Sequence, residues 1–175
     1  MDIIARAKEI GFTEVTEFDP KILVARDDVR KMCEDNKCFA YGHNWTCPPY
    51  CGTIPECQDK MHSFKHAVML QTTGTLRKLI DIKGYKETEE KHNANLYALA
   101  DELLDNQLDC LVLGAGGCRR CKHCAHPAPC VNPDRAISSM EAHGLLISQV
   151  CKDIGIPYYH GEKTITYFSC ILYNE

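Results

Sequence analysis

Apolar and polar residues follow two different spacings in the first part of the chain. Residues 3–10 carry apolar side chains at helical spacing, and Gly11 follows them, so a short helix ending at Gly11 is predicted. Residues 12–18 alternate between apolar and polar, which is typical of a half-buried strand. Pro20 at a first helical position predicts a second helix through residues 21–36.

The rest of the chain continues this change between strand and helix patterns. The runs "HAVMLQTT", "DCLVLGAGG", "PYYHG" and "TITYFSCILY" are predicted strands. Residues 86–107 and 134–154 show helical patterns. Strands that alternate with helices predict an α/β fold. We expect one single-domain layered sandwich over residues 1–175, with a central sheet and cysteine-rich loops between its elements.

Residues 33–57 have no sustained period, and Pro48, Pro49, Pro55 and two glycines interrupt them. A loop of this length is unusual inside a compact domain unless it is functional. The second cysteine-rich loop follows the predicted strand 110–114 directly. In open α/β sheets, sites lie outside the carboxyl ends of the strands, so this loop lies where a site is expected.

Net charge, hydropathy and cysteine count indicate which classes of protein fit this chain. The net charge is −4 over 175 residues, which argues against a nucleic-acid-binding protein. No apolar run approaches the ~20 residues of a membrane span, and no secretory signal is seen, so we expect no membrane association and a cytoplasmic location. The 12 cysteines would be reduced there, which favours metal binding over disulfides. Thiolate-rich sites oxidise in air, which suits an anaerobic host.

The cysteines of the second loop, Cys118, Cys121, Cys124 and Cys130, have the spacing C-x2-C-x2-C-x5-C. A [4Fe–4S] cluster suits a C-x2-C-x2-C run with a fourth cysteine further on, whereas structural zinc usually takes two separated pairs. The spacing therefore favours an iron–sulfur cluster, with zinc as the alternative. Basic residues between these cysteines, such as Arg119, Arg120 and Lys122, can offset the negative charge of a cluster.

The first loop contains five further cysteines, and their spacing matches no standard zinc pattern. Cys33, Cys38 and Cys47 are candidate ligands of a second centre, with Cys51, Cys57 or Cys130 as its fourth ligand. The alternative is a packed loop with buried free thiols, since a free cysteine behaves as a small hydrophobic residue.

Other residues gave weaker signals. Cys110, Cys151 and Cys170 lie within strand or helix patterns and are expected in the core. His123 and His126 lie beside better-spaced cysteines and are expected to be loop residues. The glycines at 114–117 lack the frame of a dinucleotide-binding loop.

Several motifs occur together in one order: Cys33-x4-Cys38, Tyr41-Gly42, Cys47-Pro48-Pro49, the Cys118–Cys130 run, Pro133 and "SMEAHG" at 139–144. In these the chain resembles, over nearly its whole length, a family of cysteine-rich predicted metal-binding proteins of unknown function. That family is common in anaerobic bacteria and archaea. The resemblance implies metal binding by Cys33, Cys38, Cys47, Cys118, Cys121, Cys124 and Cys130, and it leaves Cys51 open.

Three functional hypotheses follow. The first is an iron–sulfur protein with one or two [4Fe–4S] clusters that passes electrons to a redox protein partner. The second is a zinc-binding structural or interaction module. The third is an enzyme with an open-coordination cluster that acts as a Lewis acid, held by Cys33, Cys38 and Cys47 alone.

Overall fold

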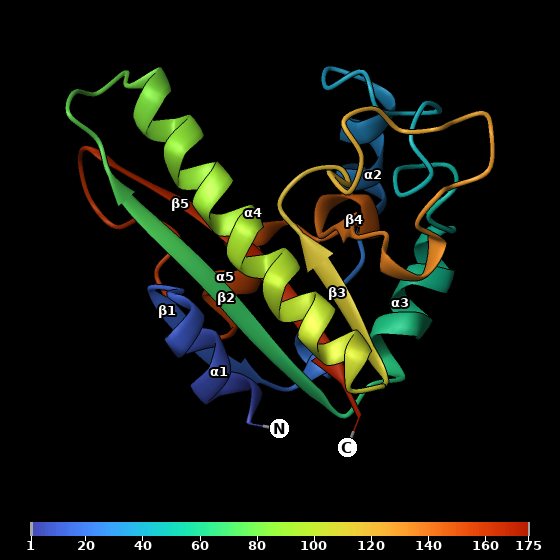
Figure 1. The fold of residues 1–175 in the computed structure, drawn as a ribbon, viewed down its shortest axis with the longest axis horizontal. Helices are drawn as coiled ribbons and strands as arrows, with labels where there is room; N and C mark the ends of the chain where they lie inside the picture. The colour runs from blue at the N-terminus through green and yellow to red at the C-terminus, as the bar shows by residue number, and fades with distance from the viewer. Residues whose placement is uncertain (1, 175) are drawn as a thin grey trace.

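A five-stranded sheet forms the centre of the molecule. The computed structural model describes residues 2–174. The strands are β1 (Glu14–Phe18), β2 (His66–Thr75), β3 (Cys110–Gly114), β4 (Ser138–Ser139) and β5 (Thr164–Tyr173). Their order in the sheet is β1-β2-β5-β3-β4, and Figure 1 shows β2 and β5 running side by side along its length. The neighbouring strands are antiparallel except for the short parallel pair β3–β4.

Helices cover both faces of this sheet. On one face lie α1 (Ile3–Ile10) and the long α4 (Ile82–Asp105), which crosses the sheet in Figure 1. The other face packs against α3 (Ile54–His62) and α5 (Ile147–Asp153). The short α2 (Asp27–Glu34) lies beside these, near the cysteine loops. The predicted layered α/β arrangement is confirmed.

The two hydrophobic cores follow from alternation along the central strands. On β2, Ala67 and Met69 face the α3/α5 side, whereas Val68 and Leu70 face α1 and α4. All four side chains are fully buried. A strand that is buried on both faces has a continuous apolar sequence, which explains the run "AVML".

Two predicted helices are wrong in their extent. Residues 20–22 form one 3-10 turn, and the chain is extended at Arg26 before α2 begins at Asp27, because Arg26 N donates to the carbonyl of Gly144 (2.9 Å). The predicted helix 134–154 is mostly absent. Its residues form a 3-10 turn, strand β4, the 3-10 turn η3 (Glu141–His143) and only then α5.

The break in that second helix has a backbone cause. Met140 N donates to the carbonyl of Gly114 instead of to its own chain segment (3.1 Å). Gly144 then takes a left-handed conformation with φ +77°, which ends η3. The predicted strand 157–161 is also absent.

Helix α3 was not predicted, although its start has a clear signal. Thr53 accepts a hydrogen bond from Glu56 N, and the Glu56 carboxylate accepts one from Thr53 N (2.7 Å), which together form a capping box. Pro55 stands in the first turn, where its missing N–H costs nothing. The aperiodic loop therefore ends at Thr53.

The two cysteine loops, residues 35–53 and 115–137, lie on the same side of the molecule, beyond the carboxyl end of β3 (Figure 1). Residues 2–174 contain no helix that is both long and apolar enough to cross a membrane.

Candidate metal centres

The two cysteine loops contact each other directly through Trp45, Thr46 and their partners. The indole Nε1 of Trp45 donates to the carbonyl of Ala128 (2.8 Å). Ser138 Oγ donates to the carbonyl of Thr46 (2.7 Å), and Cys118 N donates to Thr46 Oγ1 (3.4 Å). These bonds bring segments that are far apart in the sequence to one place.

An aromatic cluster supports the same contact. The rings of Trp45, Tyr50 and His126 lie with centroids 4.8–4.9 Å apart, a distance at which aromatic rings attract each other. His126 therefore packs within this aromatic cluster, and His123 is exposed.

The second loop is also held to α4 by its arginines. Arg120 Nη1 donates to Asp101 Oδ2 (2.8 Å), and the guanidinium lies over the ring of Tyr97. Arg119 forms an ion pair with Glu89. Hydrogen bonding from Arg120 lowers the pKa of the Asp101 carboxyl. The charges of both arginines are thus paired with helix carboxylates.

A cavity of about 490 Å³ separates the two loops. Thiols of Cys33 at the end of α2, Cys38 and Cys47 in the first loop, and Cys118 after β3 line it. Gly117 forms part of the wall, and a side chain there would begin 3.6 Å from the sulfur of Cys47. The fold therefore brings thiols from three segments to one cavity.

A second, much smaller pocket lies between the second loop and residues 44–46 of the first loop. It measures about 20 Å³ and is lined by all four cysteines of the C-x2-C-x2-C-x5-C run, Cys118, Cys121, Cys124 and Cys130. Asn132 Nδ2 donates to the sulfur of Cys121 (3.3 Å). Cys130 thus lies with its own set, and Cys118 lines both spaces.

Two thiols of the larger cavity, Cys33 and Cys47, have raised pKa values. Burial, and then the neighbouring thiols of Cys38 and Cys33, raise the pKa of Cys47 to about 11. Burial also raises the pKa of Cys33. A bound metal cation reverses this balance, because it deprotonates the thiols that ligate it.

One carboxylate shares the larger cavity with these thiols. Glu141, in η3, lines the cavity, and its Oε2 atom is buried without a hydrogen-bond partner. Burial raises the pKa of this carboxyl group. Sequence reasoning did not identify Glu141, although it lies inside the quoted "SMEAHG" motif.

Cys51 and Cys57 do not line the larger cavity. Both sulfurs lie near the same nitrogen of Arg30: Nη2 is 3.8 Å from Cys51 Sγ and 3.7 Å from Cys57 Sγ. The interaction with Cys51, and to a lesser degree Arg30, lowers the pKa of Cys57, whereas that of Cys51 is raised. These two thiols form a separate pair, which the sequence pattern did not separate from the other cysteines.

The remaining cysteines lie in strands and helices. Cys151 and Cys170 are fully buried among apolar side chains, and Cys110 is half-buried beside the core between the sheet and α4. Burial raises the pKa of the Cys151 thiol to about 11.

Among residues 2–174, no three His, Cys, Asp or Glu side chains converge on a point where one ion would bind them. The thiols of the cavity are therefore spread around a space rather than gathered at one point.

Comparisons with known proteins complete this description. Neither the curated proteins nor the solved structures include a significant match. One protein family, described as predicted metal-binding protein (DUF2284), matches residues 16–173 and so spans both cysteine loops. The chain belongs to this family of predicted metal-binding proteins.

Proposed function

We propose that this is an iron–sulfur protein that carries a [4Fe–4S] cluster in the larger cavity and passes electrons to a protein partner. The observation that supports it best is the cavity of about 490 Å³, lined by Cys33, Cys38, Cys47 and Cys118. Four thiolates are the usual ligand set of such a cluster.

The size of the cavity favours a cluster over one ion. Tetrahedral zinc holds its sulfurs at about 2.3 Å, which requires neighbouring sulfurs only ~3.8 Å apart. No set of three ligands among residues 2–174 meets at a single point. The cavity is also many times larger than the ~30 Å³ that one water molecule occupies in the liquid.

The cluster, when bound, would supply one-electron redox chemistry at a potential that its surroundings set. The protein's part is to hold the four thiolates and to limit water. Cys47 is buried, and Ala40, Pro48 and Ala142 give the wall an apolar character. An apolar wall and few hydrogen bonds to sulfur are levers that tune such a potential.

The surface around the cavity suits a partner protein. Cys38 is exposed, so one edge of a bound cluster would lie near solvent. Large apolar side chains are also exposed around the two loops: Phe39 is 81% exposed, Val131 68% and Met32 59%. Exposed apolar groups rimmed by polar ones are typical of interaction sites.

Anaerobic purification with quantification of iron, acid-labile sulfide and zinc tests the proposal. We expect a brown protein whose visible absorbance bleaches with dithionite. Cys47→Ser should lose this iron, whereas Cys151→Ser, a matched change at a core thiol, should keep it. A colourless wild-type protein with stoichiometric zinc would rule the proposal out.

A zinc-stabilised loop is the second candidate, and the small pocket favours it. About 20 Å³ suits one ion, and Cys121, Cys124 and Cys130 come from one short run. No three ligand side chains converge on one point in residues 2–174, so these thiols would have to move together to bind it. Zinc there would act as a staple for residues 115–137. Cys121→Ser would then lose zinc and leave the iron of the larger cavity unchanged.

An open-coordination cluster is the third candidate, and Glu141 favours it. If Cys118 ligates in the small pocket, the larger cavity keeps three thiols and the unpartnered Glu141 oxygen. Glu141 would then position or protonate a substrate bound at the open iron. Binding of a small anion that changes the EPR spectrum in the wild type but not in Glu141→Gln would support this role.

A further inference from the structure

Cys51 and Cys57 lie outside the larger cavity, where their thiols interact directly with each other beside one guanidinium. Arg30 Nη2 is 3.8 Å from the first sulfur and 3.7 Å from the second. The same nitrogen donates to the carbonyl of Ala142 (2.7 Å), and Nη1 donates to the carbonyl of Gly52 (2.8 Å). These two backbone bonds fix the guanidinium, so both sulfurs stay beside a cation that stabilises thiolates.

The backbone between the two cysteines turns sharply and keeps their side chains close. Cys57 Sγ lies 3.5 Å from the carbonyl oxygen of Cys51. Gly52 has φ +99°, a conformation that favours glycine, and a Cβ atom there would begin 3.8 Å from Cys57 Sγ. Cys57 lies in the first turns of α3, where the helix N-terminus also favours a thiolate.

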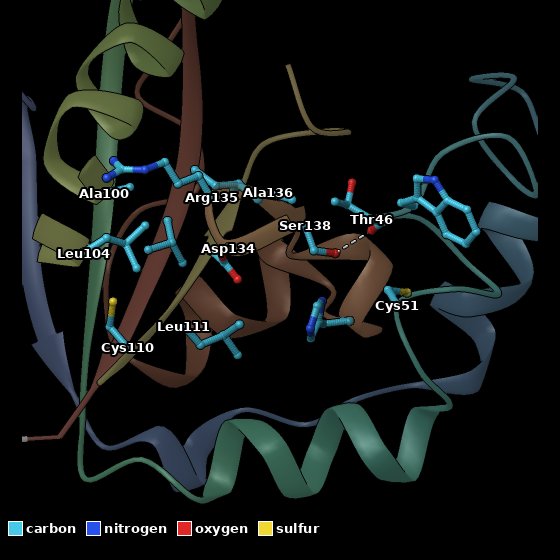
Figure 2. Close-up of a pocket in the computed structure, with 14 residues that line it drawn as sticks. Thr46, Cys51, Ala100, Leu104, Cys110, Leu111, Asp134, Arg135, Ala136 and Ser138 are labelled. Carbon is cyan, nitrogen blue, oxygen red and sulfur yellow. Dashed lines mark hydrogen bonds between the residues drawn. The ribbon is translucent and has the colours of Figure 1, made fainter. Parts of the chain in front are cut away.

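The two thiols differ in access. Cys57 is 1% exposed, whereas Cys51 is half-buried and lines a groove of about 260 Å³. Figure 2 shows Cys51 at one end of this groove, near Thr46 and Ser138, with Cys110 and Leu104 at the other end. A small reagent in the groove therefore reaches Cys51 first.

We propose that Cys51 and Cys57 are a redox-active dithiol that closes reversibly to an intramolecular disulfide when it meets a low-molecular-weight disulfide. No ligand role in the larger cavity is needed for this, so the inference does not depend on which metal the protein holds. The accessible Cys51 is the thiol that a small disulfide reaches, and the buried Cys57 beside Arg30 is the resolving thiol.

The chemistry is two successive thiol–disulfide exchanges. The Cys51 thiol gives up its proton as its sulfur attacks one sulfur of the small disulfide; the S–S bond breaks, and one thiolate leaves. The Cys57 thiolate then attacks the Cys51 sulfur of the mixed disulfide and releases the second small thiolate. The two protons given up by Cys51 and Cys57 end on the two released thiols. The protein pair is oxidised by two electrons, and the small disulfide is reduced by two.

Formation of the disulfide would change the contacts of Arg30, which reach the wall of the larger cavity. Arg30 lies on α2, which ends beside Cys33, and it binds the carbonyl of Ala142, which lines the cavity. Oxidation joins the two sulfurs that lie beside Arg30 and so changes the contacts of its guanidinium. The oxidation state of the dithiol would thus depend on the thiols and disulfides around the protein and would in turn affect the wall of the larger cavity.

Differential alkylation tests the inference on the anaerobically purified, metal-loaded protein. The protein is equilibrated with oxidised and reduced glutathione at a series of ratios. It is then alkylated and reduced, and a second, isotopically distinct reagent is added. We expect Cys51 and Cys57 to lose labelling by the first reagent together. Above the midpoint potential of the pair, this labelling should fall about tenfold for each ~30 mV rise in the glutathione potential. Before reduction, the peptide pair should carry a mass lower by two hydrogens.

Two variants and one internal control make the result decisive. Cys57→Ser should trap a glutathione adduct on Cys51, and Cys51→Ser should give no adduct on the buried Cys57. Cys151 should stay a thiol throughout, as a core residue. A disulfide that joins other cysteines, or two free thiols at a ratio that fully oxidises dithiothreitol, would overturn the inference. Metal content, measured in the same samples, reports separately on the proposed cluster.

Discussion

The larger cavity and the small pocket share Cys118 but are assembled in different ways. The cavity draws its thiols from the end of α2, the first loop and the segment after β3. The pocket takes all of its thiols from residues 118–130. The thiols of the cavity therefore come together from three segments, whereas those of the pocket come from one loop, although Asn44, Trp45 and Thr46 of the first loop complete its wall. Long-range assembly couples metal binding to the whole fold, and local assembly does not.

Replacement of Cys118, the thiol that lines both spaces, should change the metal content more than any other substitution considered below. Cys118→Ser removes a ligand candidate from both spaces, so metal at both should fall to less than half of the wild-type content. Cys47→Ser and Cys121→Ser, which each touch one space, should each spare the other. Metal analysis of the three variants checks this. A Cys118→Ser protein with full metal content would contradict a shared position.

Gly144→Ala should disturb the cavity without changing any thiol. Gly144 has φ +77°, and a Cβ atom there would lie 2.7 Å from Ile54 Cδ1 and 2.8 Å from the backbone nitrogen of Arg26. We expect a loss of about 3 kcal/mol in the free energy of unfolding, from strain and overpacking. Denaturant unfolding measures it.

Metal analysis of the same variant sharpens the comparison. At temperatures where Gly144→Ala is folded, the cavity should lose metal before the pocket does, because η3 and α2 meet at Gly144. Gly155→Ala is a matched control, since Gly155 also has positive φ but no atom within 4 Å of its Cβ position. Equal metal loss in both variants would contradict the coupling of the cavity to this contact.

Acid should weaken the fold through two buried histidines. Burial lowers the pKa of His143, which lines the groove beside Cys51, and of His92, in the α4 core, each to about 4. The unfolded chain takes up these protons near pH 6.5 and the folded chain only near pH 4. The stabilisation is therefore complete above pH 6.5 and is lost as the pH falls towards 4. Each histidine should cost about 2 kcal/mol at pH 5.

Urea unfolding of the metal-free protein between pH 7.5 and 5 measures this loss. His143→Gln should flatten the pH dependence, whereas His123→Gln, at an exposed position in the second loop, should leave it unchanged. An unchanged slope in His143→Gln would show that His143 is not the titrating group.

The smallest expected effect comes from Trp45→Phe, at the contact between the loops. The change keeps an aromatic ring near Tyr50 and His126 but removes the N–H that donates to Ala128. One partly exposed hydrogen bond is worth about 0.5–1 kcal/mol. We expect faster loss of metal to a chelator from both spaces, and Tyr50→Phe as a control with no such change.

Much of the fold could be predicted from local pattern. The strands 66–75, 110–114 and 164–173 are apolar runs, and α4 has a clear helical period. The helix predicted over 134–154 was wrong because the backbone of Ser138–Met140 is taken by β3, which helical periodicity does not reveal. Helix α3 was detectable from Thr53 and Glu56 but was missed among the cysteines.

The candidate site shows the same division. Spacing pointed to the second cysteine set, because a local run can wrap what it binds, whereas the first set was proposed from the length of its loop and its number of thiols. The sequence pattern did not show which thiols of the two loops line the same cavity, because that depends on the long-range hydrogen bonds of Trp45 and Thr46. The position of Cys51 beside Arg30, away from Cys47, also depends on tertiary contacts, because Arg30 is held by Ala142 from a distant segment.

The outward position of two thiols has a consequence for the lifetime of the protein. Cys38 and Cys124 are exposed, whereas the other candidate ligands are half-buried or buried. Exposed thiolates are the first to climb from sulfenic to sulfinic acid, and the later step is irreversible. In the proposed electron carrier, the exposed edge at Cys38 would be both where an electron leaves and where oxygen arrives first, so fast exchange with a partner and durability in air would oppose each other there.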